Sequence, residues 1–279
     1  MENILLLTDA GKPDINTLDF GCYVANLTRS NLNLYFLQEF IGEERPALKQ
    51  LFGMPYVESI YAADFPENKE KRNSYKDNER IFGEFCRNRG INFQVHHQKQ
   101  PNIQQILKES RYADLIIVNP DTCLGAKLQD TPSSFVKQIL AGSECPVLIA
   151  PYEFEGIDEI LFTHDGSKSS VFAIKQFIHL LPQLNHMKIT VLEIQEYGKE
   201  LHKERNQLLA LLNNHYDQIS LVRLQGKASD ELFGYLLGKQ NIMVVMGAFG
   251  RGMLSNLFKA SVADLVVRTI NLPVFISHG

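Results

Sequence analysis

The sequence predicts an α/β fold made of two consecutive doubly wound domains, each a parallel sheet with helices on both faces. First, short apolar runs alternate with segments whose apolar residues recur at helical spacing, as in βαβ units. Second, the chain repeats itself: Cys145–Ala150 (CPVLIA) matches Leu272–Ser277 (LPVFIS), 127 residues later. Third, Ile4–Asp9 matches Ile160–Asp165, 156 residues later.

These two offsets also predict the domain boundaries. They differ by 29 residues, so the first copy carries extra material, which fits the polar, proline-interrupted segment around 42–71. A linker near Tyr152–Gly156 joins the copies. We therefore expect one domain over residues 1–152 and a second over residues 157–279.

Within each copy the same order of elements is expected. The first copy has apolar strand candidates at Ile4–Thr8, Leu34–Gln38, Asn92–His96, Leu115–Val118 and Val147–Ala150. The second has them at Glu159–Thr163, Lys188–Ile194, Ile219–Leu224, Ile242–Met246 and Val274–Ser277. Between the latter strands, helices are predicted around Val171–Leu181, His202–Tyr216, Leu232–Leu237 and Val262–Ile270, the last with Ser261 as its N-cap. Buried parallel strands of this kind bind ligands beyond their carboxyl ends, where strand order reverses.

Composition and charge indicate which partners and which cellular environment to expect. A net charge of −4 gives no electrostatic reason to expect nucleic acid as a partner. No run approaches the roughly 20 apolar residues that span a bilayer, and the first apolar run meets Asp9 at once, so neither membrane nor signal peptide is expected. The cysteines Cys22, Cys86, Cys123 and Cys145 are scattered, which favours reduced thiols in a cytoplasmic protein.

The stretch from Val244 to Ser261 carries the strongest functional signal. An apolar run ends at Gly247, Gly250 follows, and the small pair Ala260-Ser261 opens a helix. Small residues let a backbone approach a ligand closely, and a helix start attracts phosphate. Neither the Walker nor the dinucleotide pattern is present. The spacing instead resembles the nucleotide loop of the universal stress protein family, Gly-x2-Gly-x9-Gly-Ser/Thr, with Ala260 in place of the third glycine.

The resemblance covers nearly the whole chain as two tandem domains, and it implies an adenine nucleotide, ATP, in the second domain, with Mg²⁺ held through the phosphates. The Rossmann-like fold of this family, also called adenine nucleotide alpha hydrolase-like, agrees with the predicted sheets. In the family, Asp-Gly-Ser after the first strand contacts the nucleoside. The nucleotide-binding residues expected from the resemblance and from the loop chemistry are Asp165, Gly166, Ile194, Met246, Gly247, Gly250, Arg251, Ala260 and Ser261.

Two departures from the family pattern qualify this expectation. Ala260 would cost roughly 1–2 kcal/mol if its backbone needs a positive φ, so weaker or altered binding is predicted. In the first copy, Pro120 stands opposite Gly247 and Cys123 opposite Gly250. Because proline lacks an N–H, that loop cannot form the same cradle, and the first copy is interpreted as a structural or partner-binding half.

No catalytic constellation stands out. His96-His97 is the only close histidine pair, and neighbouring strand residues point to opposite faces, which is poor geometry for a metal. The leading hypothesis is a stress-response sensor that binds ATP without turning it over. A slow ATP hydrolase and a scaffold without nucleotide remain as alternatives. The family resemblance also implies pairing of the last strands, Val147–Ala150 with Val274–Ser277, as a pseudo-dimer within one chain; further homodimerisation stays open.

Overall fold

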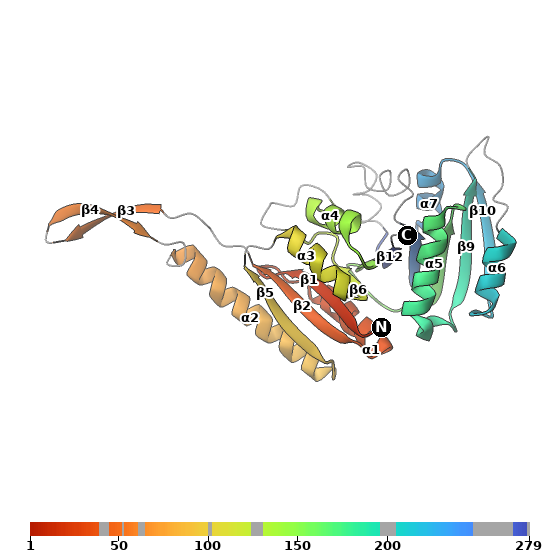
Figure 1. Ribbon diagram of the computed structural model, residues 1–279, viewed down its shortest axis with the longest axis horizontal. Coiled ribbons are helices and arrows are strands. Elements are labelled where there is room, and N and C mark those ends of the chain that lie inside the picture. The colour runs from red at the N-terminus through yellow and green to blue at the C-terminus, as the bar shows by residue number, and fades with distance from the viewer. Residues whose placement is uncertain are drawn as a thin grey trace.

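The computed structural model describes residues 1–38, 45–51, 53–60, 65–99, 102–123, 131–195, 205–247 and 270–277. Ten of the described strands form one sheet, and two more form a separate sheet that stands apart from it (Figure 1). The large sheet consists of two groups of five strands, one from each half of the chain. The fold is therefore the mostly parallel α/β arrangement that the sequence predicts.

The first half contributes strands in the spatial order β5-β2-β1-β6-β7, all parallel. These strands are β1 (Asn3–Asp9), β2 (Asn31–Gln38), β5 (Phe93–Lys99), β6 (Leu115–Val118) and β7 (Val147–Ile149). The described helices between them are α1 (Ile15–Thr28), α2 (Pro66–Asn88), α3 (Ile103–Glu109), the 3-10 turn η2 (Ser110–Tyr112) and α4 (Ser134–Gly142).

The second half repeats this topology in the order β10-β9-β8-β11-β12, again parallel. Its strands are β8 (Glu159–His164), β9 (Lys188–Gln195), β10 (Ile219–Gln225), β11 (Ile242–Gly247) and β12 (Val274–Ser277). The described helices are α5 (Lys168–Leu180), the 3-10 turn η3 (Pro182–Leu184), α6 (Arg205–Asn213) and α7 (Ala228–Leu236). The expected helix at Val262–Ile270 lies, except for Ile270, outside the described residues.

The two halves meet through their last strands. β7 and β12 pair antiparallel, with Val147 opposite Ile276 and Ile149 opposite Val274. A proline precedes each strand, at Pro146 and Pro273, where its missing N–H does not interrupt the ladder. The family resemblance implied a pairing of these last strands, and this pairing gives each half's last strand a neighbour on both sides.

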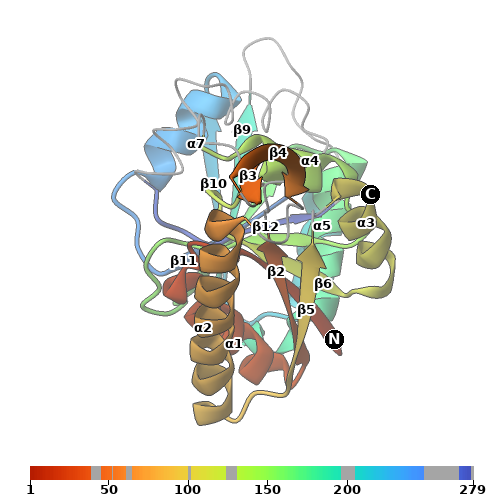
Figure 2. The same ribbon diagram turned by 90° about the vertical axis from the view of Figure 1, so that its left-hand side faces the viewer.

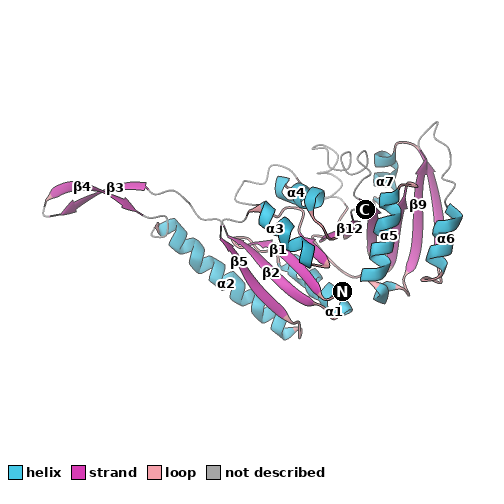
Figure 3. Ribbon diagram, viewed as in Figure 1, coloured by secondary structure: helices cyan, strands magenta, loops and turns pink. Residues whose placement is uncertain are grey.

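Side chains alternate between two apolar layers, one on each face of the sheet. One layer joins Ile4 and Leu6 of β1 to α1 and α2, and Ile160 and Phe162 of β8 to α5 and α6. The other layer packs the intervening strand residues against α3, α4 and α7. Helices therefore cover both faces in each half (Figure 3). Within the described residues, no helix has the length and apolar content to cross a bilayer.

The extra segment of the first copy contains a β-hairpin. β3 (Arg45–Leu51) and β4 (Met54–Ile60) pair antiparallel around Gly53, whose φ of +85° is left-handed. The hairpin extends far from the sheet beyond the start of α2 (Figure 1), and lies in front of the body in the turned view (Figure 2). From the sequence, segment 42–71 could be characterised only as polar and interrupted by prolines. In the structure it includes this hairpin and the first turn of α2.

Candidate functional site

Strand order in the second half reverses between β8 and β11. β8 is followed by β9 on one side of this point, and β11 is followed by β12 on the other. Ligands of doubly wound sheets bind at such a point, beyond the carboxyl ends of the strands. Asp165 directly follows β8 and Gly247 ends β11, so the structure brings both predicted residues to this point.

Asp165 begins a tight turn that leads into α5. Gly166 has a φ of +72°, a left-handed conformation that favours glycine. The Ser167 N–H donates to Asp165 Oδ1 at 3.0 Å, while Ser167 Oγ caps α5 by accepting from the Ser170 N–H at 3.1 Å. Burial opposes ionisation of Asp165, but hydrogen bonds from Ser167 and Ser170 outweigh it and lower its pKa. Asp165 therefore presents an ionised carboxylate at neutral pH.

Gly247 has a packing role that the sequence did not reveal. A Cβ at this position would lie 2.6 Å from both the carbonyl carbon and Oγ of Ser169, in the first turn of α5. This distance is far inside van der Waals contact, and the backbone carbon cannot simply rotate away. Only glycine lets β11 pass the start of α5 so closely.

A pocket with an empty volume of about 390 Å³ opens at this point, which we call the second-half pocket. Its lining consists of Thr163, His164, Asp165, Ser167, Ser170, Leu192, Ile194, Met246 and Gly247. Leu192, Ile194 and Met246 supply apolar surface, and the Asp165 turn supplies polar groups. An apolar lining with a few polar groups is typical of small-molecule sites.

The structure thus gathers part of the predicted set. Asp165, Ile194, Met246 and Gly247 line one pocket although they come from three strand ends. Gly166 shapes the turn beside it. The other predicted residues, Gly250, Arg251, Ala260 and Ser261, lie outside the described residues.

Beside the pocket lies a buried charged cluster. Glu193 is opposite His164 of β8 and Arg223 of β10 in the strand register, so the three residues form one row across the sheet. Glu193 Oε1 lies 3.3 Å from His164 Nδ1, and Glu193 Oε2 lies 3.0 Å from Arg205 Nη2 and 3.5 Å from Arg223 Nε. The side chain of His164 is 0% exposed and that of Glu193 is 6% exposed.

This cluster was not identified from the sequence. Glu193 alternates with Val191 and Ile189, which face the layer containing α5 and α6, so a charge there is buried on the same face. A glutamate at an inward position of an apolar strand was the available signal. Its partners could not be found because Arg205 and Arg223 come from elements later in the chain.

The corresponding edge of the first half is occupied by its own side chains. Asp14 Oδ2 accepts from Thr17 Oγ1 at 2.6 Å and from Asn119 Nδ2 at 3.0 Å. Asp121 accepts from Thr131 Oγ1 at 2.7 Å and from the Tyr152 hydroxyl at 3.0 Å. This network surrounds Pro120, the residue opposite Gly247. The expectation that the first copy does not form the same cradle stays a prediction, because residues 124–130 of this loop lie outside the described residues.

Metal binding finds no support in the part of the chain that the structure describes. Those residues contain no group of three or more His, Cys, Asp or Glu side chains arranged around a common point. His96 stacks on Tyr35 at 4.6 Å between ring centroids and lies 2.9 Å from Asn33 Oδ1, whereas His97 lies 3.0 Å from Gln38 Nε2. The two neighbouring rings are thus engaged with different partners.

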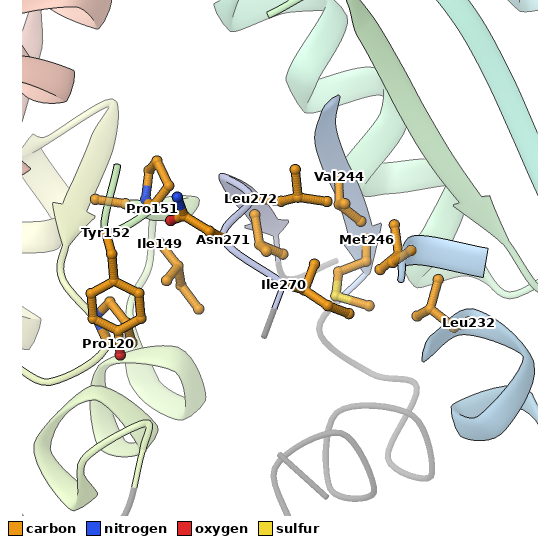
Figure 4. Close-up of a pocket in the computed structure, with 13 residues that line it drawn as sticks. Pro120, Ile149, Pro151, Tyr152, Leu232, Val244, Met246, Ile270, Asn271 and Leu272 are labelled. Carbon is orange, nitrogen blue, oxygen red and sulfur yellow. The ribbon is translucent and has the colours of Figure 1, made fainter. Parts of the chain in front are cut away.

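A second, larger pocket lies where the two halves meet (Figure 4). Its empty volume is about 590 Å³, and side chains from both halves line it, among them Ile149, Leu232, Met246 and Leu272. Among the described residues of this lining, Tyr152 and Asn271 have polar side chains and the others are apolar.

Comparison with known proteins relates part of the chain to a protein family. Residues 188–278 match the model of the universal stress protein family. This part of the chain is therefore similar to a universal stress protein domain. The match begins at β9 and includes β11 and β12, so it contains Ile194, Met246 and Gly247 of the second-half pocket.

Solved structures extend the likeness in fold to the whole chain. A universal stress protein from Archaeoglobus fulgidus is 16% identical, with a TM-score of 0.64, over 99% of this chain and 96% of that one. A putative universal stress protein from Pseudomonas aeruginosa is 13% identical, with a TM-score of 0.57, over 99% of this chain and 93% of that one. At these identities the likeness shows a shared fold. No curated protein matches the chain.

Proposed function

We propose that this protein is a cytoplasmic stress-response sensor whose second domain binds ATP without turning it over. The observation that carries the proposal is the convergence of Asp165, Ile194, Met246 and Gly247 on one pocket at the strand-order reversal. These residues come from separate elements, and the family resemblance had selected each of them. A pocket built at this place by those residues supports a nucleotide better than a general packing role does.

The chemistry of the pocket suits a nucleoside. The flat adenine ring would lie against Leu192, Ile194 and Met246, because aromatic rings gain most from apolar surface. The Asp165 carboxylate is ionised and would accept hydrogen bonds from the ribose hydroxyls or the adenine amino group. We expect the phosphates to follow the chain beyond Gly247, toward Gly250, Arg251, Ala260 and Ser261, with Mg²⁺ bound through the phosphate oxygens.

We propose the same division of the chain as the sequence suggests, with one domain over residues 1–152 and another over 157–279. In this proposal the first domain has no nucleotide site, because Asp14, Asn119 and Asp121 bond to their own neighbours at the equivalent edge. It serves as a structural or partner-binding half. The antiparallel β7–β12 pair would hold the two domains together as a pseudo-dimer.

Calorimetric titration with ATP and Mg²⁺ tests the nucleotide site. Asp165→Ala removes a charged acceptor and should weaken binding by about 10- to 100-fold, from about 1.5–3 kcal/mol for a hydrogen bond to a charged group. Asp9→Ala is the matched control. Asp9 ends β1, the counterpart of β8, and its Oδ1 likewise accepts from a turn N–H, that of Gly11, at 2.7 Å.

The two variants distinguish the hypotheses. Binding that is lost with Asp165→Ala and kept with Asp9→Ala places ATP in the second-half pocket. No heat and no thermal stabilisation of the unaltered protein at millimolar ATP would leave the scaffold as the working hypothesis. Phosphate release, measured on the same samples, tests whether the bound nucleotide is hydrolysed.

A further inference from the structure

Two cysteines that lie far apart in the sequence meet in the core of the first half. Cys22 is on α1 and Cys86 is on α2, 64 residues later, and their Sγ atoms are 3.9 Å apart. Both side chains are 0% exposed. Neither residue belongs to the proposed nucleotide site, which lies in the other half of the chain.

We propose that Cys22 and Cys86 form a reversible disulfide when the protein meets a hydroperoxide, and that this bond links α1 to α2. A disulfide brings two sulfurs to about 2.05 Å, so the observed pair must close by roughly 2 Å. Small rotations of the two side chains with a slight approach of the helices would supply this shift.

The surroundings of the pair favour one sulfur as the nucleophile. The hydrogen bond between the two thiols lowers the pKa of Cys86, and the nearby cations Arg89 and Arg87 lower it further, while burial acts in the opposite direction. The same hydrogen bond, together with burial, raises the pKa of Cys22. Cys86 lies in the last turn of α2, close to Arg87 and Arg89 at the helix end, so we expect its thiolate to react first.

The chemistry then proceeds in two balanced steps. The Cys86 thiolate attacks one peroxide oxygen and the O–O bond breaks, which leaves Cys86 as a sulfenic acid and releases the other oxygen as hydroxide or alkoxide. The Cys22 sulfur attacks the Cys86 sulfur, an S–S bond forms, and the S–O bond breaks. The departing hydroxide takes the proton of Cys22 and leaves as water. The two thiols lose two electrons together, and the hydroperoxide is reduced.

Access to the buried pair is expected through the end of α2. Cys86 lies in the last turn of α2. Directly after this helix, Arg89 forms a 2.7 Å ion pair with Asp19 of α1. Both partners of this ion pair are more than a third exposed, so it contributes little stability. Helix ends open locally at low cost, and opening here would expose Cys86.

A disulfide between Cys22 and Cys86 would tie down the segment that carries the projecting β3–β4 hairpin. The segment between the two cysteines, which are 64 positions apart, includes the β3–β4 hairpin, and α2 leads back from that hairpin to the sheet (Figure 1). The disulfide would close this segment into a loop anchored on α1. Closing a loop of this length should raise the unfolding temperature by roughly 5–10 °C.

The test uses the full chain treated with hydrogen peroxide, then unfolded in the presence of iodoacetamide and digested for mass spectrometry. We expect a peptide pair linking Cys22 to Cys86, two hydrogens lighter than the separate peptides, that dithiothreitol separates. The unfolding temperature should rise with the linked fraction. Cys22→Ala should abolish both effects, and Cys145→Ser, which alters another buried cysteine, should leave both unchanged.

Two results would overturn the proposal. In one, peroxide oxidises Cys123 while Cys22 and Cys86 both remain open to alkylation after unfolding. In the other, the link forms only when peroxide is added to protein already unfolded in denaturant. If Cys22→Ala does not fold, the unaltered chain still decides, because the linked peptide is measured in it directly.

Discussion

Replacing Glu193 by glutamine should destabilise the second half of the protein more than any other single loss of charge near the pocket. Glu193 is 5% exposed and sits between His164, Arg205 and Arg223 at the carboxyl ends of β8, β9 and β10. Glutamine keeps the size of the side chain but removes its negative charge. Arg205 then remains in a mostly buried place without its counter-ion.

The size of the effect follows from the exposure of the partners. Breaking a buried ion pair from one side costs about 3–5 kcal/mol, because the remaining charge stays desolvated. Arg205 is 20% exposed and holds Glu193 with both Nε and Nη2, so it suffers most of that loss. Arg223 is 49% exposed and stays hydrated, so we assign no part of the lost stability to it. We therefore expect a loss of about 3 kcal/mol in the free energy of unfolding.

Urea unfolding followed by circular dichroism measures this loss as a fall of the midpoint by about 1 M at an unchanged slope. Glu159→Gln is the matched control, since Glu159 pairs with Lys188 at 3.1 Å at the opposite ends of the same two strands. Lys188 is 51% exposed, so that substitution should cost less than about 1 kcal/mol. Equal losses for the two variants would refute the reasoning, because burial would then not decide the cost.

Three further outcomes are expected. Gly247→Ala forces a Cβ to within 2.6 Å of the Ser169 backbone, so it should cost about 1–3 kcal/mol in urea unfolding and weaken ATP binding; an unaffected protein would show that α5 can move aside. Asp165 has a lowered pKa, so its ionised form stabilises the fold at neutral pH, and this contribution is lost as pH falls below about 3.8. The difference in unfolding free energy between the unaltered protein and Asp165→Asn should therefore shrink as pH falls below about 4, and a constant difference down to about pH 2 would contradict it. Burial raises the pKa of Cys145 to about 12, so this thiol should resist dithionitrobenzoate at pH 8, roughly, until urea unfolds the chain, whereas rapid labelling of folded protein would show that it is accessible.

Much of the fold follows from local pattern, and the structure places the strands close to their expected positions. The run around Leu115–Val118 becomes β6 with the same bounds, and Val274–Ser277 becomes β12. The ends of helices follow less closely from the sequence. The helix expected over Leu232–Leu237 ends at Leu236, and Leu237 is 54% exposed. Apolar spacing identifies a helix, but the last turn depends on what covers it.

The candidate site also contains some residues that the sequence could identify and others that it could not. Asp165 and Gly247 could be found because each stands at the end of an apolar run, where the chain must leave a parallel sheet. The cluster around Glu193 could not be found, since it depends on which strands are neighbours. The same holds for Cys22 and Cys86, which meet only because α1 and α2 pack on one face.

The sequence by itself determined the two copies of the unit, the order of strands and helices within each, and the residues that follow the strands at the point where strand order reverses. It could do so because apolar periodicity, glycine and proline act within a few residues of chain. Only the tertiary structure decided that one edge of the sheet holds a pocket and that Asp14, Asn119 and Asp121 form hydrogen bonds with neighbouring side chains at the equivalent edge. It also decided that Gly247 is needed for packing and that Glu193 has buried partners. These properties depend on distances between segments far apart in the chain, which no local pattern specifies.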